Sequence, residues 1–352
     1  MASVSATATG LSLGSVSIAV SRPGRAARPR RCPCLASLAR SLRPSARPWR
    51  RNSRHAHRAM TDSTRPLPLA LVEAAEQEGR TAWLATLPGT VARLARAWSL
   101  SVEAPFQPGG QTAWVAPVRD RAGAELVLKI GWAHPEAIDE ADGLGVWSGH
   151  GAVRVHAAEQ THDTSALLLE RCRPGTPLAA RPEPEQDEVL AGLLGGLWVQ
   201  PPAGHTFRPL QVMVDQWAEE FRQQLAAEPG LLDSGLAREG IALFQRLPSS
   251  ADRQVLLATD AHAGNVLAAQ REPWLLIDPK PYVGDPAYDA LQHLLNCAER
   301  LHADPTALAD RMAGLLEGVD RVRLRRWLFA RCVLEAPGDP ALADVALRIP
   351  ID

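Results

Sequence analysis

An aspartate and an asparagine in the second half of the chain have a spacing that is typical of phosphoryl transfer. Asp260 precedes Asn265 by five positions, and Asp278 follows thirteen residues after Asn265. In the catalytic loops of kinases the aspartate orients the acceptor hydroxyl and takes its proton, while the asparagine binds Mg²⁺. The spacing makes Asp260 a candidate base and makes Asn265 and Asp278 candidate metal ligands.

A predicted β-hairpin should bring the two candidate metal ligands together. Residues 266–269 and 274–277 are apolar, and the turn between them is polar and ends in proline. The ends of a hairpin meet, with strands about 5 Å apart, so Asn265 should lie beside Asp278. An amide carbonyl and a carboxylate offer oxygen ligands with one charge, which suits Mg²⁺ carrying phosphates better than Zn²⁺.

The chain contains 36 arginines but only two lysines, Lys129 and Lys280. A lysine retained against such a bias indicates a task for a compact point charge, which a guanidinium cannot supply. Lys129 lies near the end of a strand predicted over residues 125–130, which pairs in a hairpin with residues 113–118. For Lys280 two roles stay open, because it could neutralise a phosphate or hold the loop after Asp278.

A helix predicted over residues 135–147 supplies the partner of Lys129. Glu140 lies near the inward face of that helix, and Glu136, one turn earlier, is the competitor. An ammonium held by a glutamate is the arrangement that places a lysine against the α- and β-phosphates of ATP. Glu140 is favoured over Glu136, and a solvated helix face is the alternative for either residue.

The remaining elements indicate two lobes. A buried strand over residues 166–170 breaks at Arg171 and a Pro-Gly pair, as a hinge would, and helical patterns follow over residues 185–199, 212–225 and 236–247. We expect an α+β, two-lobed protein-kinase-like fold. Its small N-terminal lobe would hold an antiparallel sheet plus one helix, and its larger C-terminal lobe would be mainly α.

Three passages resemble the aminoglycoside phosphotransferase superfamily, and especially its group of streptomycin 6-kinases and hydroxyurea phosphotransferases. They are residues 168–175, 259–267 and 277–289, and the likeness covers about residues 83–337. The resemblance implies ATP bound at a hinge around Glu170 to Cys172 and Lys129 on the phosphates. It also implies Asp260 as base and Mg²⁺ on Asn265 and Asp278.

The chain departs from the superfamily at one point, since Ala258 and Thr259 stand where many members have His-Gly before the catalytic aspartate. His262 is interpreted as a residue that braces the loop and not as a base. Asp285, followed by a proline, is predicted to cap a helix and serve as an anchor.

Composition divides the chain in two. Residues 1–59 contain twelve arginines and no acidic residue, and residues 60–352 carry a net charge of about −13. The first segment is expected to be a disordered leader, such as a transit peptide, or an upstream extension ahead of a natural start at Met60. Residues 60–170 and 171–352 are predicted as the ATP-binding and catalytic lobes. The expected location is cytoplasmic, or plastid or mitochondrial if the leader is genuine.

The acidic body favours a cationic small molecule and disfavours nucleic acid, and no run of 18 apolar residues predicts a membrane span. The expected acceptor is a hydroxyl of an aminoglycoside such as streptomycin, or of another small molecule such as hydroxyurea. Two other classes stay open: a nucleotide-binding pseudokinase, and a metal-dependent hydrolase using Asp260, His262 and Asp278. The oligomeric state has no signal in the sequence. Candidate acids of the C-terminal half for contact with a cationic acceptor are Asp215, Glu219, Glu220 and Asp233.

Overall fold

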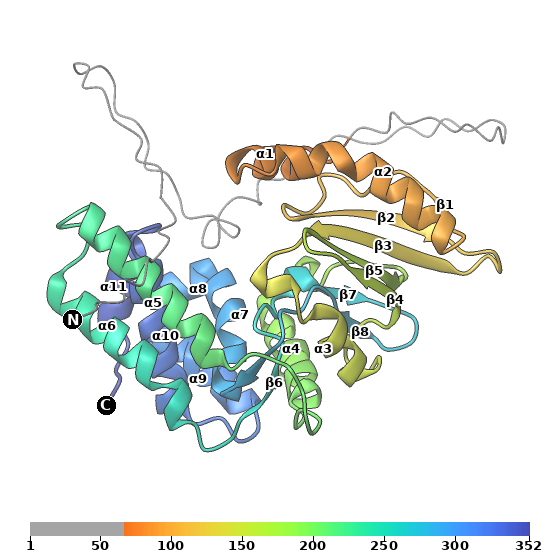
Figure 1. The fold of residues 1–352 in the computed structure, drawn as a ribbon. Helices are drawn as coiled ribbons and strands as arrows, with labels where there is room; N and C mark the ends of the chain where they lie inside the picture. Colours follow the sequence, from red (N-terminus) through yellow and green to blue (C-terminus); the bar gives the residue numbers. More distant parts are fainter. Residues whose placement is uncertain (1–66) are drawn as a thin grey trace, which may run out of the picture.

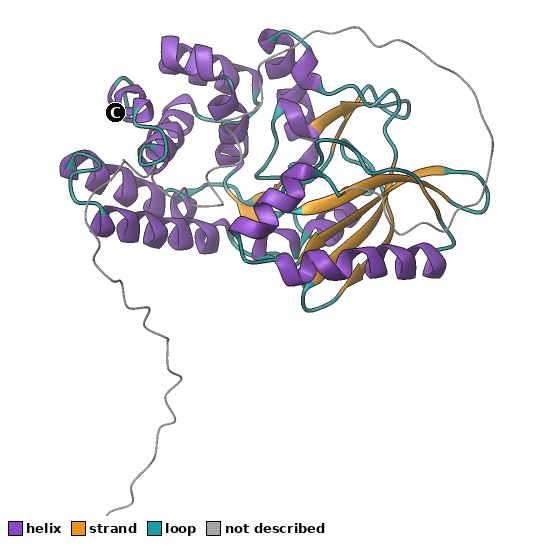
Figure 2. Ribbon diagram, turned by 90° about the horizontal axis from the view of Figure 1, so that it is seen from above, coloured by secondary structure: helices purple, strands orange, loops and turns teal. Residues whose placement is uncertain are grey.

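The computed structural model describes residues 67–352, which form a sheet-based N-terminal lobe and a helical C-terminal lobe (Figures 1 and 2). The predicted α+β, two-lobed fold is confirmed. Residues 1–59, predicted as a leader or extension, lie outside the described residues. No helix within residues 67–352 combines the length and apolarity that a membrane span requires.

The N-terminal lobe is built on an antiparallel sheet. Within the described residues its strand order is β1-β2-β3-β5-β4, and each strand is antiparallel to its neighbours. Alternation along β3 buries Leu128 and Ile130 on one face and turns Lys129 to the other. The strands are β1 Ser101–Val102, β2 Ala113–Arg119, β3 Glu125–Trp132, β4 Val155–Gln160 and β5 Thr164–Glu170.

Helices α1 (Leu69–Gln77) and α2 (Thr81–Ala97) cover the outer face of this sheet (Figure 1). Their buried side chains, among them Trp83 and Leu87, share one apolar cluster with Leu128 and Ile130. These two helices add to the single helix predicted for this lobe. They fix the sheet from behind, so its other face is left to form the cleft between the lobes.

The predicted helix over residues 135–147 is interrupted. Pro135–Ala137 form a 3₁₀ turn (η1), and the α-helix α3 runs from Glu140 to Trp147. Asp139 between them has φ −96° and ψ 2°, which is outside α-helical geometry. The break changes the direction of the chain between Glu136 and Glu140, so these two carboxylates reach different partners.

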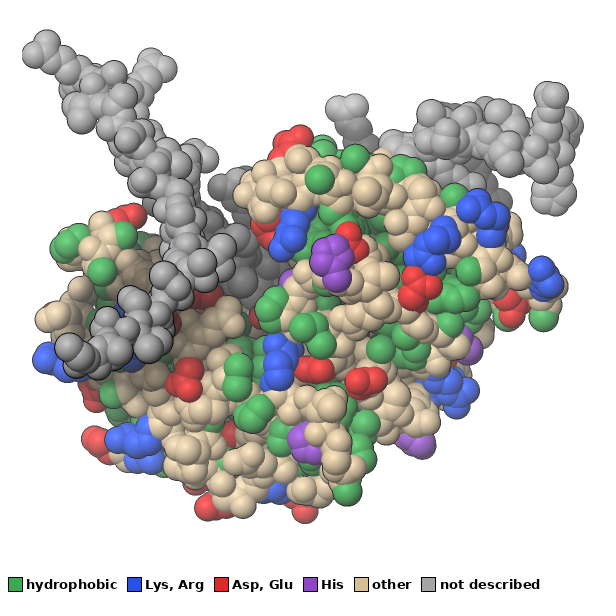
Figure 3. Space-filling model, in the orientation of Figure 1, with side chains coloured by type: hydrophobic (Ala, Val, Ile, Leu, Met, Phe, Trp, Pro, Cys, Tyr) green, Lys and Arg blue, Asp and Glu red, His purple; other side chains and the backbone are tan. Residues whose placement is uncertain are grey.

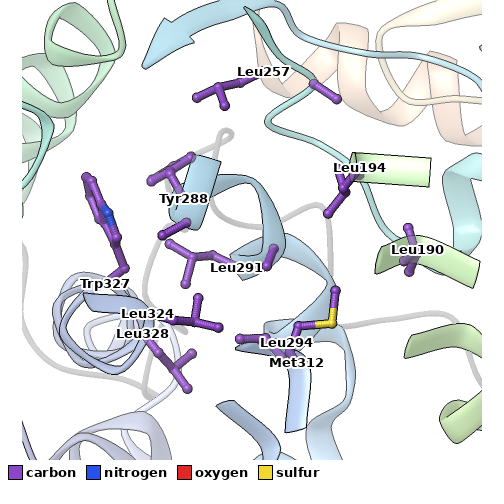
Figure 4. Close-up of a cluster of buried hydrophobic side chains, with 14 of the residues drawn as sticks. Leu190, Leu194, Leu257, Tyr288, Leu291, Leu294, Met312, Leu324, Trp327 and Leu328 are labelled. Atoms are coloured by element: carbon purple, nitrogen blue, oxygen red, sulfur yellow. The ribbon is translucent and has the colours of Figure 1, made fainter. Parts of the chain in front are cut away.

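The C-terminal lobe packs its helices around α10, whose buried side chains include Leu324, Trp327 and Leu328 (Figure 4). The helices predicted over residues 185–199, 212–225 and 236–247 are confirmed as α4, α5 and α6. The α-helices are α4 Glu183–Leu197, α5 Leu210–Ala227, α6 Ser234–Arg246, α7 Leu291–Asn296, α8 Ala298–Ala303, α9 Pro305–Leu315, α10 Arg321–Glu335 and α11 Ala341–Leu347. The 3₁₀ helices are η2 Leu178–Ala180, η3 Pro248–Ser250, η4 Ala263–Asn265 and η5 Pro286–Ala290.

Two short strand pairs lie where the lobes meet. β7 (Val266–Ala268) pairs with β8 (Trp274–Leu276), which confirms the predicted hairpin. β6 (Val255–Leu257) pairs with β9 (Tyr282–Gly284), a pairing that the sequence did not predict. Together they hold the loop 258–265 and the segment 277–281 side by side.

Candidate active site

A cleft of about 380 Å³ lies between the sheet and the β7–β8 hairpin. This volume is within the range of small-molecule and cofactor sites. Val115 and Val127 line it from the sheet, and Leu267 and Ile277 line it from the hairpin, which gives an apolar slot. Its remaining lining residues are Phe106, Lys129, Val153, Leu169, Glu170, Arg171, Cys172, Arg173, Pro174, Gly175 and Asp278.

The contact predicted between Lys129 and Glu140 is present, and Asp278 joins it. The Lys129 ammonium lies 2.7 and 2.6 Å from the two carboxylate oxygens of Glu140 and 2.5 Å from Oδ1 of Asp278. Burial would lower the pKa of Lys129, but the two carboxylates outweigh it and raise the pKa. Two carboxylates on one ammonium leave an excess negative charge, which a cation bound nearby would offset.

Glu136, the competitor for Lys129, contacts Lys280 instead. Nζ of Lys280 lies 3.4 Å from Oε2 of Glu136 and 3.1 Å from Oδ2 of Asp260. Burial raises the pKa of Asp260, and Lys280 pulls against that rise. Each of the two lysines is therefore shared between two carboxylates in the same region.

Asn265 lies between the candidate base and the candidate metal ligand. Its amide nitrogen donates to the backbone carbonyl of Asp260 at 3.1 Å and to Oδ2 of Asp260 at 3.3 Å. The backbone carbonyl of Asn265 accepts from the N–H of Ile277 at 2.8 Å, which sets Asn265 beside Asp278 as the hairpin predicted. With the nitrogen used in this way, the amide oxygen is the atom left for a cation.

Asp289 braces the loop that carries Asp260, a role that sequence reasoning missed. Its carboxylate accepts from the N–H of Ala258 at 3.1 Å, the N–H of Thr259 at 2.6 Å and the indole N–H of Trp198 at 3.0 Å. Burial raises its pKa to about 6, although these hydrogen bonds oppose the rise. No local pattern marks Asp289, because its partners lie about 30 or more positions away in the chain.

The two residues predicted to be structural are structural. A ring nitrogen of His262 accepts from the N–H of Gly264 at 3.1 Å and so caps η4. The Asp285 carboxylate accepts from the N–H of Ala287 at 3.0 Å, and from Arg323 at 2.6 Å and Trp327 at 2.5 Å. Asp285 therefore ties the start of η5 to α10.

Two hinge side chains predicted at the nucleotide site, Glu170 and Cys172, line the cleft. The Glu170 carboxylate accepts two hydrogen bonds from Arg271, at 3.0 and 2.9 Å. Burial raises the pKa of the Cys172 thiol to about 11, so the thiol stays protonated. Within residues 67–352, the backbone N–H of Cys172 makes no hydrogen bond.

A second cluster of possible metal ligands is better explained as a charge network. Asp187, His293 and Cys297 offer ligand atoms within 4.8 Å of one another. The Asp187 carboxylate, however, accepts from Arg300 at 2.8 Å and from Arg311 at 2.7 Å as well as lying 2.9 Å from His293. Two guanidinium groups on the same carboxylate would repel a cation.

Two of the four acids predicted to contact a cationic acceptor, Asp233 and Asp215, make hydrogen bonds away from the cleft. Asp233 caps α6 through the N–H groups of Gly235 and Leu236. Asp215 accepts from the side-chain amides of Gln211 and Gln245. Neither contact involves the cleft.

The amino-acid sequence of the chain is similar to that of a known family of kinases. The sequence profile of the aminoglycoside/hydroxyurea antibiotic resistance kinases matches residues 98–338. The chain is 33% identical over 293 residues to a streptomycin 6-kinase from Streptomyces glaucescens, covering 80% of this chain and 92% of that protein. It is 35% identical over 292 residues to a hydroxyurea phosphotransferase from Kitasatospora aureofaciens, covering 80% and 82%.

The fold has solved counterparts at much lower identity. The choline kinase LicA from Streptococcus pneumoniae superposes with a TM-score of 0.51 at 10% identity, covering 73% of this chain and 91% of that one. Fold and site thus define a two-lobed, kinase-like phosphotransferase that acts on a hydroxyl group of a small molecule. The chain belongs to the aminoglycoside/hydroxyurea antibiotic resistance kinase family.

Proposed function

We propose that this chain transfers the γ-phosphoryl group of ATP to a hydroxyl of a small cationic molecule, with streptomycin as the leading acceptor. A bond forms from the acceptor oxygen to phosphorus, the bond to the ADP oxygen breaks, and the hydroxyl proton passes to Asp260. The observation that carries the proposal is that two contacting groups adjoin at the cleft, Lys129 with Glu140 and Asp278, and Asp260 with Asn265, which lies beside Asp278. Such transfer is catalysed mainly by positioning and by charge stabilisation.

ATP fits the cleft with its base in the apolar slot. Val115 and Val127 on one side and Leu267 and Ile277 on the other suit a flat ring. Lys129 is paired with Leu167 in the sheet and Leu126 with Glu170, so the hinge lies three residues, about 10 Å, along the strands from Lys129. That separation supports binding of the adenine base of ATP at Glu170 to Cys172 and of its phosphates at Lys129.

The oxygen ligands Asn265 and Asp278 would hold Mg²⁺ on the phosphates. The ion, when bound, neutralises charge that develops on the transferring group. The donor set fits, because a carboxylate and an amide oxygen are hard ligands. The Glu140 side chain contacts Lys129 and is only 3% exposed, so it can keep the ammonium in place while Asp278 turns to the ion.

Asp260 is assigned as the base that orients the acceptor hydroxyl. Its carboxylate is fixed on one side by Asn265 and Lys280, and the chain around it is held by Asp289. General-base help of this kind is worth about 10²- to 10⁴-fold in rate. We assign the ammonium of Lys280 to the transferring phosphoryl group, since it lies beside the carboxylate that must face that group.

The acceptor is assigned from the relatives and from charge. Two relatives are named for streptomycin or hydroxyurea, and the net charge of about −13 over residues 60–352 attracts a cation. Streptomycin carries guanidino groups that carboxylates bind well. Hydroxyurea, which is neutral, is the second candidate and gains nothing from the acidic body.

The proposal also implies a boundary between the two lobes and a cellular location. We place the boundary between the ATP-binding lobe and the catalytic lobe after Glu170, where β5 ends. A kinase that uses ATP and Mg²⁺ is expected in the cytoplasm, or in a plastid or mitochondrion if residues 1–59 direct it there.

A nucleotide-dependence assay tests the proposal against its rivals. ADP release is followed with ATP and Mg²⁺, with streptomycin, hydroxyurea or no acceptor, on protein beginning at Met60. We expect ADP release that depends on streptomycin. Turnover of an acceptor without ATP would instead indicate a metal-dependent hydrolase, and ATP binding without ADP release on either acceptor would indicate a pseudokinase.

A further inference from the structure

Arg271, in the turn between β7 and β8, joins the hairpin to the hinge. Its guanidinium donates to both carboxylate oxygens of Glu170, at 3.0 and 2.9 Å, and to the carbonyl of Ala152 at 3.0 Å. It also donates to Glu272 at 2.8 Å and to the carbonyl of Gly149. Only a planar group with several fixed donors can satisfy these acceptors at once.

Backbone hydrogen bonds attach the same hairpin to the hinge and to the segment before β4. On the hinge side, Gly175 donates to Ala268 at 2.9 Å and Ala268 donates to Thr176 at 2.9 Å. On the other side, Leu276 donates to Gly151 at 2.9 Å. The hairpin therefore cannot shift relative to the hinge without breaking contacts along both of its edges.

The position of the hairpin gives these contacts a consequence for the site. Its open end carries Asn265 and Asp278, Leu267 in β7 and Ile277 just after β8 line the slot, and its turn holds the hinge through Arg271. One small element thus touches both regions that the proposed nucleotide would occupy. A hairpin held at both ends can set the distance between the site of the adenine base and the site of the phosphates.

We propose that Arg271 is a positioning residue for the nucleotide, acting through Glu170 to hold the hinge backbone at a fixed distance from Asn265 and Asp278. The inference rests on the proposed binding of ATP in the cleft. It reassigns the Glu170 side chain, which anchors the hinge rather than contacting ATP. The backbone of residues 170–172 is then the part of the hinge that contacts the adenine base.

The contact has the character of a strong pair. The Glu170 side chain is 18% exposed and that of Arg271 is 22% exposed, so solvent screens the pair only in part. Burial alone would raise the pKa of Glu170, but hydrogen bonds from Arg271 and from the N–H of Arg154 hold it below its ordinary value. Removal of the guanidinium would leave this carboxylate without its cation and would free the hinge to move.

Nucleotide affinity in Arg271 variants tests the inference. The dissociation constant of ADP with Mg²⁺ is measured by calorimetry on the full chain for wild type, Arg271→Gln and Arg271→Lys, beside steady-state kinetics. A tenfold change in affinity corresponds to about 1.4 kcal/mol, which is within the contribution of hydrogen bonds to charged groups. We expect the Kd of ADP and the KM of ATP to rise about tenfold in Arg271→Gln and less in Arg271→Lys, with kcat and the acceptor KM within about twofold.

Two further variants separate positioning from general stability. Glu170→Gln should weaken ADP binding in the same direction, and its combination with Arg271→Gln should be no worse than Arg271→Gln alone, because both changes break one contact. Arg93→Gln breaks a similar two-point pair with Glu159 on the outside of the N-terminal lobe. It should leave ADP affinity unchanged.

Unchanged ADP affinity in both Arg271 variants would overturn the inference, as would a loss of kcat and melting temperature without a change in affinity. If Arg271→Gln does not fold, Arg271→Lys and Glu170→Gln decide. A wild-type protein that binds no ADP would instead refute the proposed function itself. Because ADP binding needs no acceptor, a wrong choice of acceptor does not affect this test.

Discussion

At the scale of single residues, the site is defined by carboxylates that share two ammonium groups. Lys129 contacts Glu140 and Asp278, and Lys280 contacts Asp260. The excess of carboxylates is stable only because these lysines lie among them, and it agrees with the proposed binding of Mg²⁺ and of phosphates. The retention of the only two lysines of the chain at this place agrees with a need for compact charges.

Lys280 offers a direct test of this reading. Lys280→Met removes the ammonium next to Asp260, and we expect kcat to fall by about 10²-fold because charge on the transferring group loses a partner. The KM of ATP should change by less than about threefold, since Lys129, the proposed partner of the α- and β-phosphates, is unchanged. Steady-state kinetics would show it. A large rise in the KM of ATP with normal kcat would contradict the assignment.

Asp289 gives the loop a dependence on pH that can be measured. Because burial raises its pKa to about 6, the folded state binds a proton more readily than the unfolded state, where the pKa is about 3.9. The contribution of this group to the free energy of unfolding is therefore greatest below pH 4. It decreases as the pH rises to about 6.

Melting temperatures of wild type and Asp289→Asn between pH 4 and pH 8 check this expectation. The advantage of wild type over the variant should shrink from pH 4 to about pH 6 and stay constant above. A constant difference over the whole range would show that the pKa of Asp289 is not raised.

At the scale of elements, helix α3 must approach the segment after Asp278 very closely. A Cβ atom placed on Gly143 would lie 2.3 Å from Cγ of Pro281, so only glycine permits this contact. The same helix carries Glu140, and the 3₁₀ turn before it carries Glu136. The packing of α3 against Pro281 thus sets the position of the partners of both lysines.

Gly143→Ala should therefore impair activity without acting on any reacting group. The added methyl group would push α3 away from Pro281, and we expect kcat/KM for ATP to fall at least about tenfold. Gly145→Ala is the matched control, because no atom lies within 4 Å of its added Cβ and alanine favours a helix by about 1 kcal/mol. Equal activity in both variants would contradict the role given to α3.

The network around Asp187 joins α4 to α7, α8 and α9. Burial would raise the pKa of Asp187, but hydrogen bonds from His293, Arg300 and Arg311 hold it far below its usual range. Its side chain is 1% exposed, so loss of the carboxylate would deprive His293, Arg300 and Arg311 of the buried acceptor that they share. A carboxyl with a lowered pKa contributes stability above about pH 4 that is lost as the pH falls.

Asp187→Ala is expected to lower the free energy of unfolding by about 3–5 kcal/mol, as the loss of one partner of a buried pair does. Chemical denaturation at pH 7 measures the change. Glu188→Gln, on the neighbouring residue, removes an exposed contact to Arg311 and should cost less than about 1 kcal/mol. Similar losses for the two variants would refute the network as a source of stability.

At the scale of the whole molecule, much of the site could be predicted because its residues lie in local patterns. The hairpin predicted over residues 266–277 and the spacing of Asp260 and Asn265 are short-range features, and the strand predicted over residues 125–130 contains Lys129. The contacts that depend on tertiary packing were not predictable, among them Asp289 on the loop and Arg271 on the hinge. The break before α3 was also missed, because a proline at the start of a helix does not reveal where the helix becomes regular.

Charge distribution is another property of the whole chain. Acidic and basic side chains are interspersed over the face shown in Figure 3, although residues 60–352 carry an excess of acids. A diffuse negative field of this kind raises the local concentration of a cationic acceptor and is weakened by salt. This agrees with a small cation as acceptor.

Transfer of phosphate to streptomycin is the most direct test of the account. Protein beginning at Met60 is incubated with ATP, Mg²⁺ and streptomycin, and the antibiotic is analysed by mass spectrometry beside an Asp260→Asn control that is checked for unchanged ADP binding. The account predicts that streptomycin gains one phosphate with the wild type, and that the rate falls by about 10²- to 10⁴-fold with the variant. A product formed equally fast by Asp260→Asn, or no phosphate transfer from ATP to any small hydroxyl compound, would contradict it.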